Sequence, residues 1–483
     1  MKPVGGLDGA FLHLETPETP MHVASLHLFE LPPRWRGDFH ARVQQLMRER
    51  LHLAPVFTRK LAPMPLQFAN PAWVQDDAVD LDWHVQRVRL PAPGGFAELQ
   101  DCVAWLHAQP MDRSRPLWQL VVIDGLEGRR AAYYFKVHHA VVDGQSGVML
   151  AHTLYDLTPR PRHIAAHAAS SGEHPGAAAL AAAALRHDAG QVVSFLRQLP
   201  QVARTVGGIA GNLADSLPKA LARPKLFAPR TIINRPIEAG RSFSAWSLPL
   251  DRLKALASAH EAKLNDVVLA LSAGTLRRWL AGQGGAPRQP LVAAMPISVR
   301  APGNTEYTTQ ATMALVSLHT DIADPVARLH AIRDSAGQVK AMAQQAKGLM
   351  PTDFPSIGAP WLMHGLAAAY GRSGLARALP PVANLVISNV PGPSVPLYAA
   401  GARMVGYWPV SIVEHGLGLN LTVMSYDGAM GFGFVAARNL VPDARALVTA
   451  LVEAYDELLA AGLPAPKARG HRRKATPGRP ESP

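Results

Sequence analysis

Two apolar runs in the first half of the chain constrain its fold more than any other feature. Residues 118–124 (WQLVVID) form one run, and residues 131–138 (AAYYFKVH) form the next. Glycines stand between them, so the two segments are close enough to pair as a β-hairpin. Around them, residues 23–29 alternate as a half-buried strand does, and residues 38–51 have the pattern of a charged helix. The segment therefore predicts a mixed α/β fold.

The second run ends in a histidine pair, His138 and His139, within the stretch HHAVVDG. The chain that follows looks helical as far as Pro159, so the pair lies where a strand ends and a helix begins. Adjacent side chains on a strand point to opposite faces, so one ring faces a pocket while the other is held in the packing. A neutral imidazole takes a proton from a hydroxyl at neutral pH and returns it to a leaving group.

Asp143 and Gly144 complete this stretch, and three other interpretations remain open for it. Asp143 is able to hydrogen-bond a histidine ring or to hold the turn closed by pairing with an arginine, and Gly144 permits a tight strand-to-helix crossing. The pair is otherwise structural, or part of a metal site, although no further Cys/His cluster lies nearby. A serine hydrolase is disfavoured, because the GxSxG spacing is absent from GQSG.

Length, cysteine content and charge limit the classes of protein to consider. A chain of 483 residues is too long for one ordinary core, so two domains are expected. The single cysteine, Cys102, excludes an intramolecular disulfide and fits a reducing cytoplasm. Neither a signal peptide nor an apolar run of about 20 residues is present, so membrane contact is expected to be peripheral. The net charge of +12 suits an anionic partner.

Composition divides the chain into four segments. We predict an N-terminal lobe at residues 1–160, an alanine-rich linker with an amphipathic helix at 161–230, a C-terminal lobe at 231–463 and a basic disordered tail at 464–483. The apolar stripe of the linker helix packs on the protein body or, with Arg197 and Arg204, lies at a lipid interface. No nucleic-acid module precedes the tail, so nucleic-acid binding is not expected.

The second half carries its own strand and turn signals. Residues 290–299 and 384–388 are predicted strands, and residues 417–434 are a predicted hairpin that turns at Asp427-Gly428. Asn265 and Asp266 precede an apolar helical stretch, and either side chain is able to cap that helix.

Six motifs in order give the chain a family resemblance. HHAVVDG is similar to the HHxxxDG signature of the CoA-dependent acyltransferase superfamily, and the whole resembles the bacterial wax ester synthase/diacylglycerol acyltransferases. The other matching segments are LDGAFLHLETP at 7–17 with PMHV at 20–23, RPLW at 115–118, NDV at 265–267, MPISVR at 295–300 and SNVPGP at 388–393.

This resemblance implies two chloramphenicol-acetyltransferase-like lobes with an active-site tunnel between them. It implies that His139 is the general base, that His138 supports its placement, and that Asp143 is a brace whose candidate partner is Arg300. Asn265 and Asp266 would lie near the tunnel or serve as helix caps. The expected substrate-binding residues are Pro116, Leu117 and Trp118 at the pocket floor, with core packing favoured for Trp118, and Asn389, Pro391 and Gly392 beside the channel for acyl-CoA.

The resemblance also implies a reaction. Acyl-CoA would be a co-substrate, with no bound cofactor and no metal, and the acceptor would be diacylglycerol, a long-chain fatty alcohol, or both. A cytoplasmic enzyme in peripheral contact with a membrane or lipid droplet is expected. The alternatives are an acyltransferase of the same fold with another hydroxyl acceptor and a non-catalytic protein that binds lipid surfaces.

Overall fold

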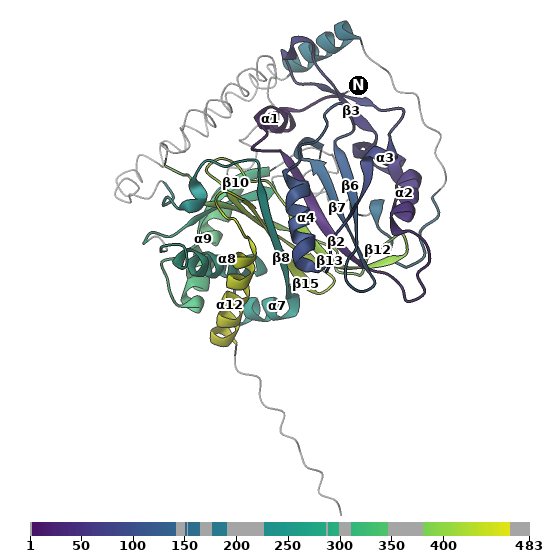
Figure 1. Ribbon diagram of the computed structural model, residues 1–483. Coiled ribbons are helices and arrows are strands. Elements are labelled where there is room, and N and C mark those ends of the chain that lie inside the picture. The colour runs from purple at the N-terminus through teal and green to yellow at the C-terminus, as the bar shows by residue number, and fades with distance from the viewer. Residues whose placement is uncertain are drawn as a thin grey trace, which may run out of the picture.

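Two six-stranded sheets organise the chain, and Figure 1 shows them side by side. The computed structural model describes residues 2–141, 150–151, 153–164, 176–190, 227–285, 288–298, 311–345 and 380–463. Each sheet has its own helices, so the predicted mixed α/β fold with two lobes is confirmed.

The first sheet has the strand order β12-β13-β2-β7-β6-β5. Only β5 and β6 run parallel, and the other neighbours are antiparallel. The strands are β2 (His22–Glu30), β5 (Val85–Arg89), β6 (Trp118–Asp124), β7 (Arg130–His138), β12 (Tyr398–Ala399) and β13 (Ala402–Val410). The predicted hairpin is formed by β6 and β7, in which Trp118 lies opposite Val137.

Helices cover both faces of this first sheet, which explains its continuous apolar runs. One face packs against α2 (Phe39–Arg50) and the other packs against α4 (Phe96–Ala108), and each face also contacts the second sheet. The charged helix predicted at residues 38–51 is therefore confirmed as α2. It begins after Asp38, whose side chain accepts a hydrogen bond of 3.0 Å from the His40 N–H and so caps the first turn.

The second sheet has the strand order β10-β9-β11-β14-β15-β8, in which β11 runs parallel to both of its neighbours. Its strands are β8 (Arg241–Pro249), β9 (Val292–Ser298), β10 (Ala311–Ser317), β11 (Leu385–Val390), β14 (Leu419–Tyr426) and β15 (Ala429–Ala437). The predicted hairpin is confirmed, with a turn at Asp427 and Gly428, whose φ angles are 41° and 81°. Its helices gather away from the first sheet (Figure 1): α7 (Leu250–Ala259), α8 (Leu264–Ala281), α9 (Pro325–Gln345) and α12 (Arg445–Gly462).

One segment of the C-terminal half belongs to the first sheet. β12 and β13 fall within the predicted lobe at 231–463, yet β13 pairs with β2, where Tyr407 lies opposite His27. The same strand crosses β15, and a Cβ on Gly433 would lie 2.0 Å from the Pro409 carbonyl oxygen. Glycine at this position therefore permits the backbones to approach closely. The C-terminal half of the chain consequently contributes β12 and β13 to the first sheet.

Smaller elements at the N-terminus surround the end of β7. The helix α1 (Gly6–Leu14) packs on the short 3₁₀ helix η4 (His139–Val141) that follows β7. A three-stranded sheet, in the order β1-β4-β3, lies close by. Its strands are β1 (Lys2–Pro3), β3 (Arg59–Ala62) and β4 (Ala72–Gln75), and α3 (Leu81–His84) precedes β5.

Several predicted segments lie wholly or partly outside the described residues. They are most of the helix expected after Asp143, the amphipathic stripe of the linker at 192–217, and the basic tail at 464–483. Within the ranges that the structure describes, no helix combines the length and the apolar character needed to cross a bilayer.

Candidate active site

The histidine pair lies at the end of β7, and its two rings have different environments. His138 is 0% exposed, whereas the half-buried His139 lines a cavity. The backbone holds both residues: His138 N–H donates to the Leu117 carbonyl at 3.0 Å, and His139 N–H donates to the Met21 carbonyl at 2.8 Å. The expectation that only one ring faces a pocket is therefore confirmed.

The cavity that His139 lines has a volume of about 180 Å³ and lies between the two sheets. The first sheet contributes side chains from β2, β7 and β13, and the second contributes Ser388, Thr422 and Met424. Beside His139 the walls are the apolar side chains of Val23 and Val137. The His139 ring therefore lies against apolar side chains on this part of the cavity wall.

Phe11 of α1 fixes the plane of the His139 ring. The two rings stack with centroids 4.0 Å apart and planes inclined by 24°. The segment around Phe11 is one of the family motifs, although no role was expected for this residue from the sequence. Only the packing of α1 against η4 brings the two rings together.

His138 contacts a buried carboxylate that sequence analysis also missed. Its Nε2 lies 3.3 Å from Glu15 Oε2, and its Nδ1 accepts a hydrogen bond of 3.1 Å from the Ala140 N–H. Burial lowers the pKa of His138, and the contact with Glu15 opposes that effect. His138 is therefore a neutral ring that donates a hydrogen bond through Nε2, which suits a supporting role.

A polar cluster lies farther along the same cavity. His27, which is 1% exposed, contacts Ser25 Oγ at 2.6 Å and the Tyr155 hydroxyl at 3.1 Å. Tyr407 stacks obliquely on the His27 ring, with centroids 4.4 Å apart. Burial lowers the pKa of His27 to about 3, so this imidazole stays neutral during any reaction near neutral pH. No role was expected for His27 from the sequence.

A second cavity adjoins the first. It has a volume of about 660 Å³, and Ala151 and Tyr155 line both cavities. Pro391 and Gly392 border this second cavity. A Cβ on Gly392 would lie 2.0 Å from the Ser425 carbonyl oxygen, so only glycine permits this turn to pack on the end of β14.

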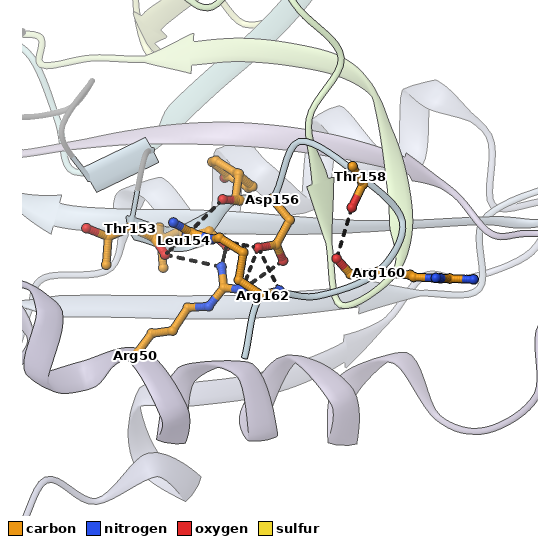
Figure 2. A network of polar contacts seen from close by, with 8 residues as sticks. Arg50, Thr153, Leu154, Asp156, Thr158, Arg160 and Arg162 are labelled. Carbon is orange, nitrogen blue, oxygen red and sulfur yellow. Dashed lines mark hydrogen bonds and ion pairs between the residues drawn. The ribbon is translucent and has the colours of Figure 1, made fainter. Parts of the chain in front are cut away.

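A buried ion pair joins Arg50 to Asp156, which lines the second cavity. Figure 2 shows the polar contacts of this pair. Arg50 Nη2 lies 2.8 and 2.7 Å from the two carboxylate oxygens of Asp156, and the two side chains are 1% and 2% exposed. Arg162 adds a bond of 2.9 Å from its Nε to Asp156 Oδ1. The cluster braces the loop that carries Tyr155, and no sequence motif indicated it.

The structure brings Asn265 and Asn389 together, and neither side chain lines either cavity. Asn389 Nδ2 donates to Asn265 Oδ1 at 3.2 Å. Helix α8 begins at Leu264, so Asn265 and Asp266 lie in its first turn and do not precede it. Asp266 Oδ2 accepts a hydrogen bond of 2.8 Å from the Lys263 N–H, which is the capping contact that was one of the two interpretations of this motif.

Pro116, Leu117 and Trp118 are buried and line neither cavity. The Trp118 indole N–H donates to the Phe57 carbonyl at 3.1 Å, as expected for core packing. Leu117 nevertheless reaches the site through its backbone, because its carbonyl accepts the His138 N–H. The motif thus supports the end of β7 through this backbone hydrogen bond and does not line a cavity.

Three predicted residues, Asp143, Gly144 and Arg300, lie outside the described ranges. Among the residues that are described, no cluster of three or more His, Cys, Asp or Glu side chains is arranged to hold a metal ion.

Comparisons of sequence and structure agree on the family. A model described as the wax ester synthase/diacylglycerol acyltransferase catalytic domain matches residues 4–268, and one described as the C-terminal domain of that family matches residues 308–459. A putative diacylglycerol O-acyltransferase of Mycobacterium tuberculosis is 35% identical, covering 94% of this chain and 98% of that protein. A probable diacylglycerol O-acyltransferase of the same species is 33% identical, covering 93% and 97%.

Solved structures give the same result. The wax ester synthase/diacylglycerol acyltransferase from Marinobacter aquaeolei VT8 is 31% identical, with a TM-score of 0.68, and the match covers 96% of this chain and 100% of that one. The first condensation domain of the calcium-dependent antibiotic synthetase is 16% identical, with a TM-score of 0.57 over 95% and 97% of the chains, and shares the fold alone. The chain therefore belongs to the wax ester synthase/diacylglycerol acyltransferase family and is an acyltransferase enzyme.

Proposed function

We propose that the enzyme transfers a fatty acyl group from acyl-CoA to the free hydroxyl of diacylglycerol, of a long-chain fatty alcohol, or of both, with His139 as the general base. The position of His139 carries this proposal: its ring lies at the end of a rigid strand and lines an apolar cavity between the two sheets. The names of the M. tuberculosis and Marinobacter relatives support these two acceptor classes.

In the proposed reaction His139 takes the proton of the acceptor hydroxyl as its oxygen attacks the thioester carbonyl. The tetrahedral intermediate then expels the CoA thiolate, which takes the proton back from His139, so the products are an ester and free CoA. No acyl-enzyme is needed, because holding both substrates in line supplies much of the acceleration. Asp143 is proposed to brace the turn after His139, with Arg300 as its partner.

Acyl-CoA is proposed to enter through the second cavity, beside Pro391 and Gly392. Its rim also supports peripheral contact with a membrane or lipid droplet, since Leu157 and Val395 line this cavity and are 67% and 46% exposed. Sedimentation of the full chain with phospholipid vesicles measures this contact. A Leu157→Ser variant that sediments as fully as the native chain would argue against this rim.

The test of the base is the variant His139→Ala, assayed with palmitoyl-CoA plus diolein or hexadecanol. Thiol release is followed, and thin-layer chromatography identifies the ester. We expect a loss of about 10²–10⁴-fold, the contribution typical of a general base. The exposed His52 serves as the control, because His52→Ala also removes an imidazole from the first lobe but lines neither cavity.

Retained turnover in a folded His139→Ala variant would overturn the assignment of the base. The same assay separates the two acceptors and decides the alternatives. If no acceptor releases thiol although vesicles still bind the chain, the protein is a lipid-surface binder. If another hydroxyl compound is acylated instead, the acceptor class is wrong.

A further inference from the structure

Glu15 directly follows the last residue of α1 and contacts His138 of the histidine pair. Its side chain is 9% exposed, and each of its carboxylate oxygens has a partner. Oε1 accepts a hydrogen bond of 3.2 Å from the Met21 N–H, and Oε2 contacts His138 Nε2 at 3.3 Å. Arg113 also donates to Oε2, through Nε at 3.0 Å and through Nη2. A carboxylate with this many donors is held in one position.

These contacts connect Glu15 to the peptide groups on both sides of the His139 Cα. On one side Met21, whose N–H donates to Glu15, accepts the His139 N–H on its own carbonyl at 2.8 Å. On the other side His138, whose Nε2 donates to Glu15, accepts the Ala140 N–H on Nδ1 at 3.1 Å. Two chains of hydrogen bonds thus connect the backbone around His139 to the Glu15 carboxylate.

The charge of Glu15 determines which way these hydrogen bonds run. Burial would raise the pKa of Glu15, but the hydrogen bonds from His138 and Arg113 and the positive charge of Arg113 outweigh it and lower the pKa to about 2. The carboxylate is therefore an acceptor only at every pH at which an esterification is assayed. It requires the proton of His138 on Nε2, which leaves Nδ1 free to accept from Ala140.

We propose that Glu15 is a positioning residue of the reaction: through Met21 and His138 it holds the peptide groups around His139, so that the base meets the acceptor hydroxyl. The inference rests on the proposed role of His139. Misplacing a catalytic group by about 1 Å costs on the order of 10²-fold in rate. Arg113, whose side chain is 38% exposed, keeps Glu15 in place from the solvent side.

The variant Glu15→Gln tests this chain of contacts, because it keeps the size of the side chain and replaces one acceptor by a donor. The new NH₂ group faces either the Met21 N–H or the His138 Nε2–H, so one tie to His139 is broken. We expect kcat to fall by about 10²-fold, with the KM for palmitoyl-CoA unchanged, since the cavity walls are untouched.

Three further variants exclude a merely structural role. Asp76→Asn removes a carboxylate of similar burial, 14% exposed, from an ion pair with Lys60 in the same lobe, and should lower stability without changing kcat. The double variant Glu15→Gln/His138→Gln should lose no more than the worse single variant, because both act along one path. If Glu15→Gln does not fold, Arg113→Met replaces it and should give an intermediate kcat.

Three results would overturn the inference: wild-type kcat in folded Glu15→Gln, a change in KM alone, or fully additive losses in the double variant. Its failure is separable from failure of the proposed function. If the His139→Ala variant is active, the assignment of His139 as the base is wrong. If His139→Ala is inactive and Glu15→Gln is fully active, only the proposed role of Glu15 is wrong.

Discussion

The two faces of β7 differ in how they treat buried polar groups. On the face of His138 the buried polar side chains form hydrogen bonds. Lys136, which is 1% exposed, donates to the carbonyls of Leu106 and Gln109 at 3.2 and 2.9 Å. On the face of His139 the neighbours Phe135 and Val137 are apolar and border open space. The strand thus has one face that is fixed by hydrogen bonds and one that borders a cavity.

This difference fits the separate roles that are proposed for the two adjacent histidines. A buried charge or polar group is costly unless it is paired, so the polar face is rigid. The other face is apolar next to His139, where Val23 and Val137 form no side-chain hydrogen bonds and border a cavity that hydrocarbon is able to fill. The proposed reaction needs both features, because the proposed base must be held in place and the lipid substrate must have room beside it.

The largest expected effect comes from breaking the buried ion pair between Arg50 and Asp156 beside the second cavity. Arg50→Ala leaves the Asp156 carboxylate buried and removes the brace of the loop that carries Tyr155. Loss of one partner of a buried ion pair costs about 3–5 kcal/mol of unfolding free energy. Urea unfolding measures it, with Arg48→Ala on the exposed side of the same helix as control. A cost equal to that of the control would show that the pair contributes nothing to the wall.

Adding bulk to either face of β7 sharpens the contrast. Val137→Trp fills the cavity beside His139, so kcat/KM for palmitoyl-CoA should fall by about 10²-fold, as it does when reacting groups are displaced. Ala132→Leu, on the opposite face and 0% exposed, should instead lower stability by about 1–3 kcal/mol through overpacking. Steady-state kinetics and thermal unfolding of both variants give the comparison. If the two effects are exchanged, the assignment of the faces is wrong.

The expected effect that is smallest at neutral pH, and that grows only on acidification, is a pH dependence from the buried imidazole of His27. Its pKa falls from 6.5 to about 3 on burial, so the unfolded chain binds a proton between these pH values and the folded chain does not. Stability should therefore fall as the pH drops from 6.5 to 3, by up to about 1.4 kcal/mol per pH unit from this group. The variant His27→Gln should show a shallower decline in urea unfolding at several pH values. An unchanged slope would mean that His27 is protonated in the folded state.

Much of the fold followed from local patterns. The apolar runs at 118–124 and 131–138, the alternation at 23–29 and the Asp427-Gly428 turn each predicted the element that the structure contains. These signals are readable because side-chain periodicity and turn chemistry act over a few residues. The family also followed, because its six motifs keep their order along the chain.

The residues around the site were less predictable. Glu15 and His138 are 123 residues apart, Arg50 and Asp156 are 106 apart, and Tyr407 reaches His27 only because β13 leaves its own half of the chain to join the first sheet. The roles of Asn265 and Asp266 were left between tunnel and cap, and the helix start at Leu264 supplies the capping contact. Such contacts depend on strand order, which no local pattern encodes.

The sequence by itself determined the family, the mixed α/β class and the position of the histidine pair at the end of a strand, because motif order, periodicity and spacing are properties of the chain. Only the tertiary structure decided what lies on each side of that strand. It placed Glu15 behind His138 and the apolar cavity in front of His139, since both environments are assembled from segments that meet only when the two sheets pack together.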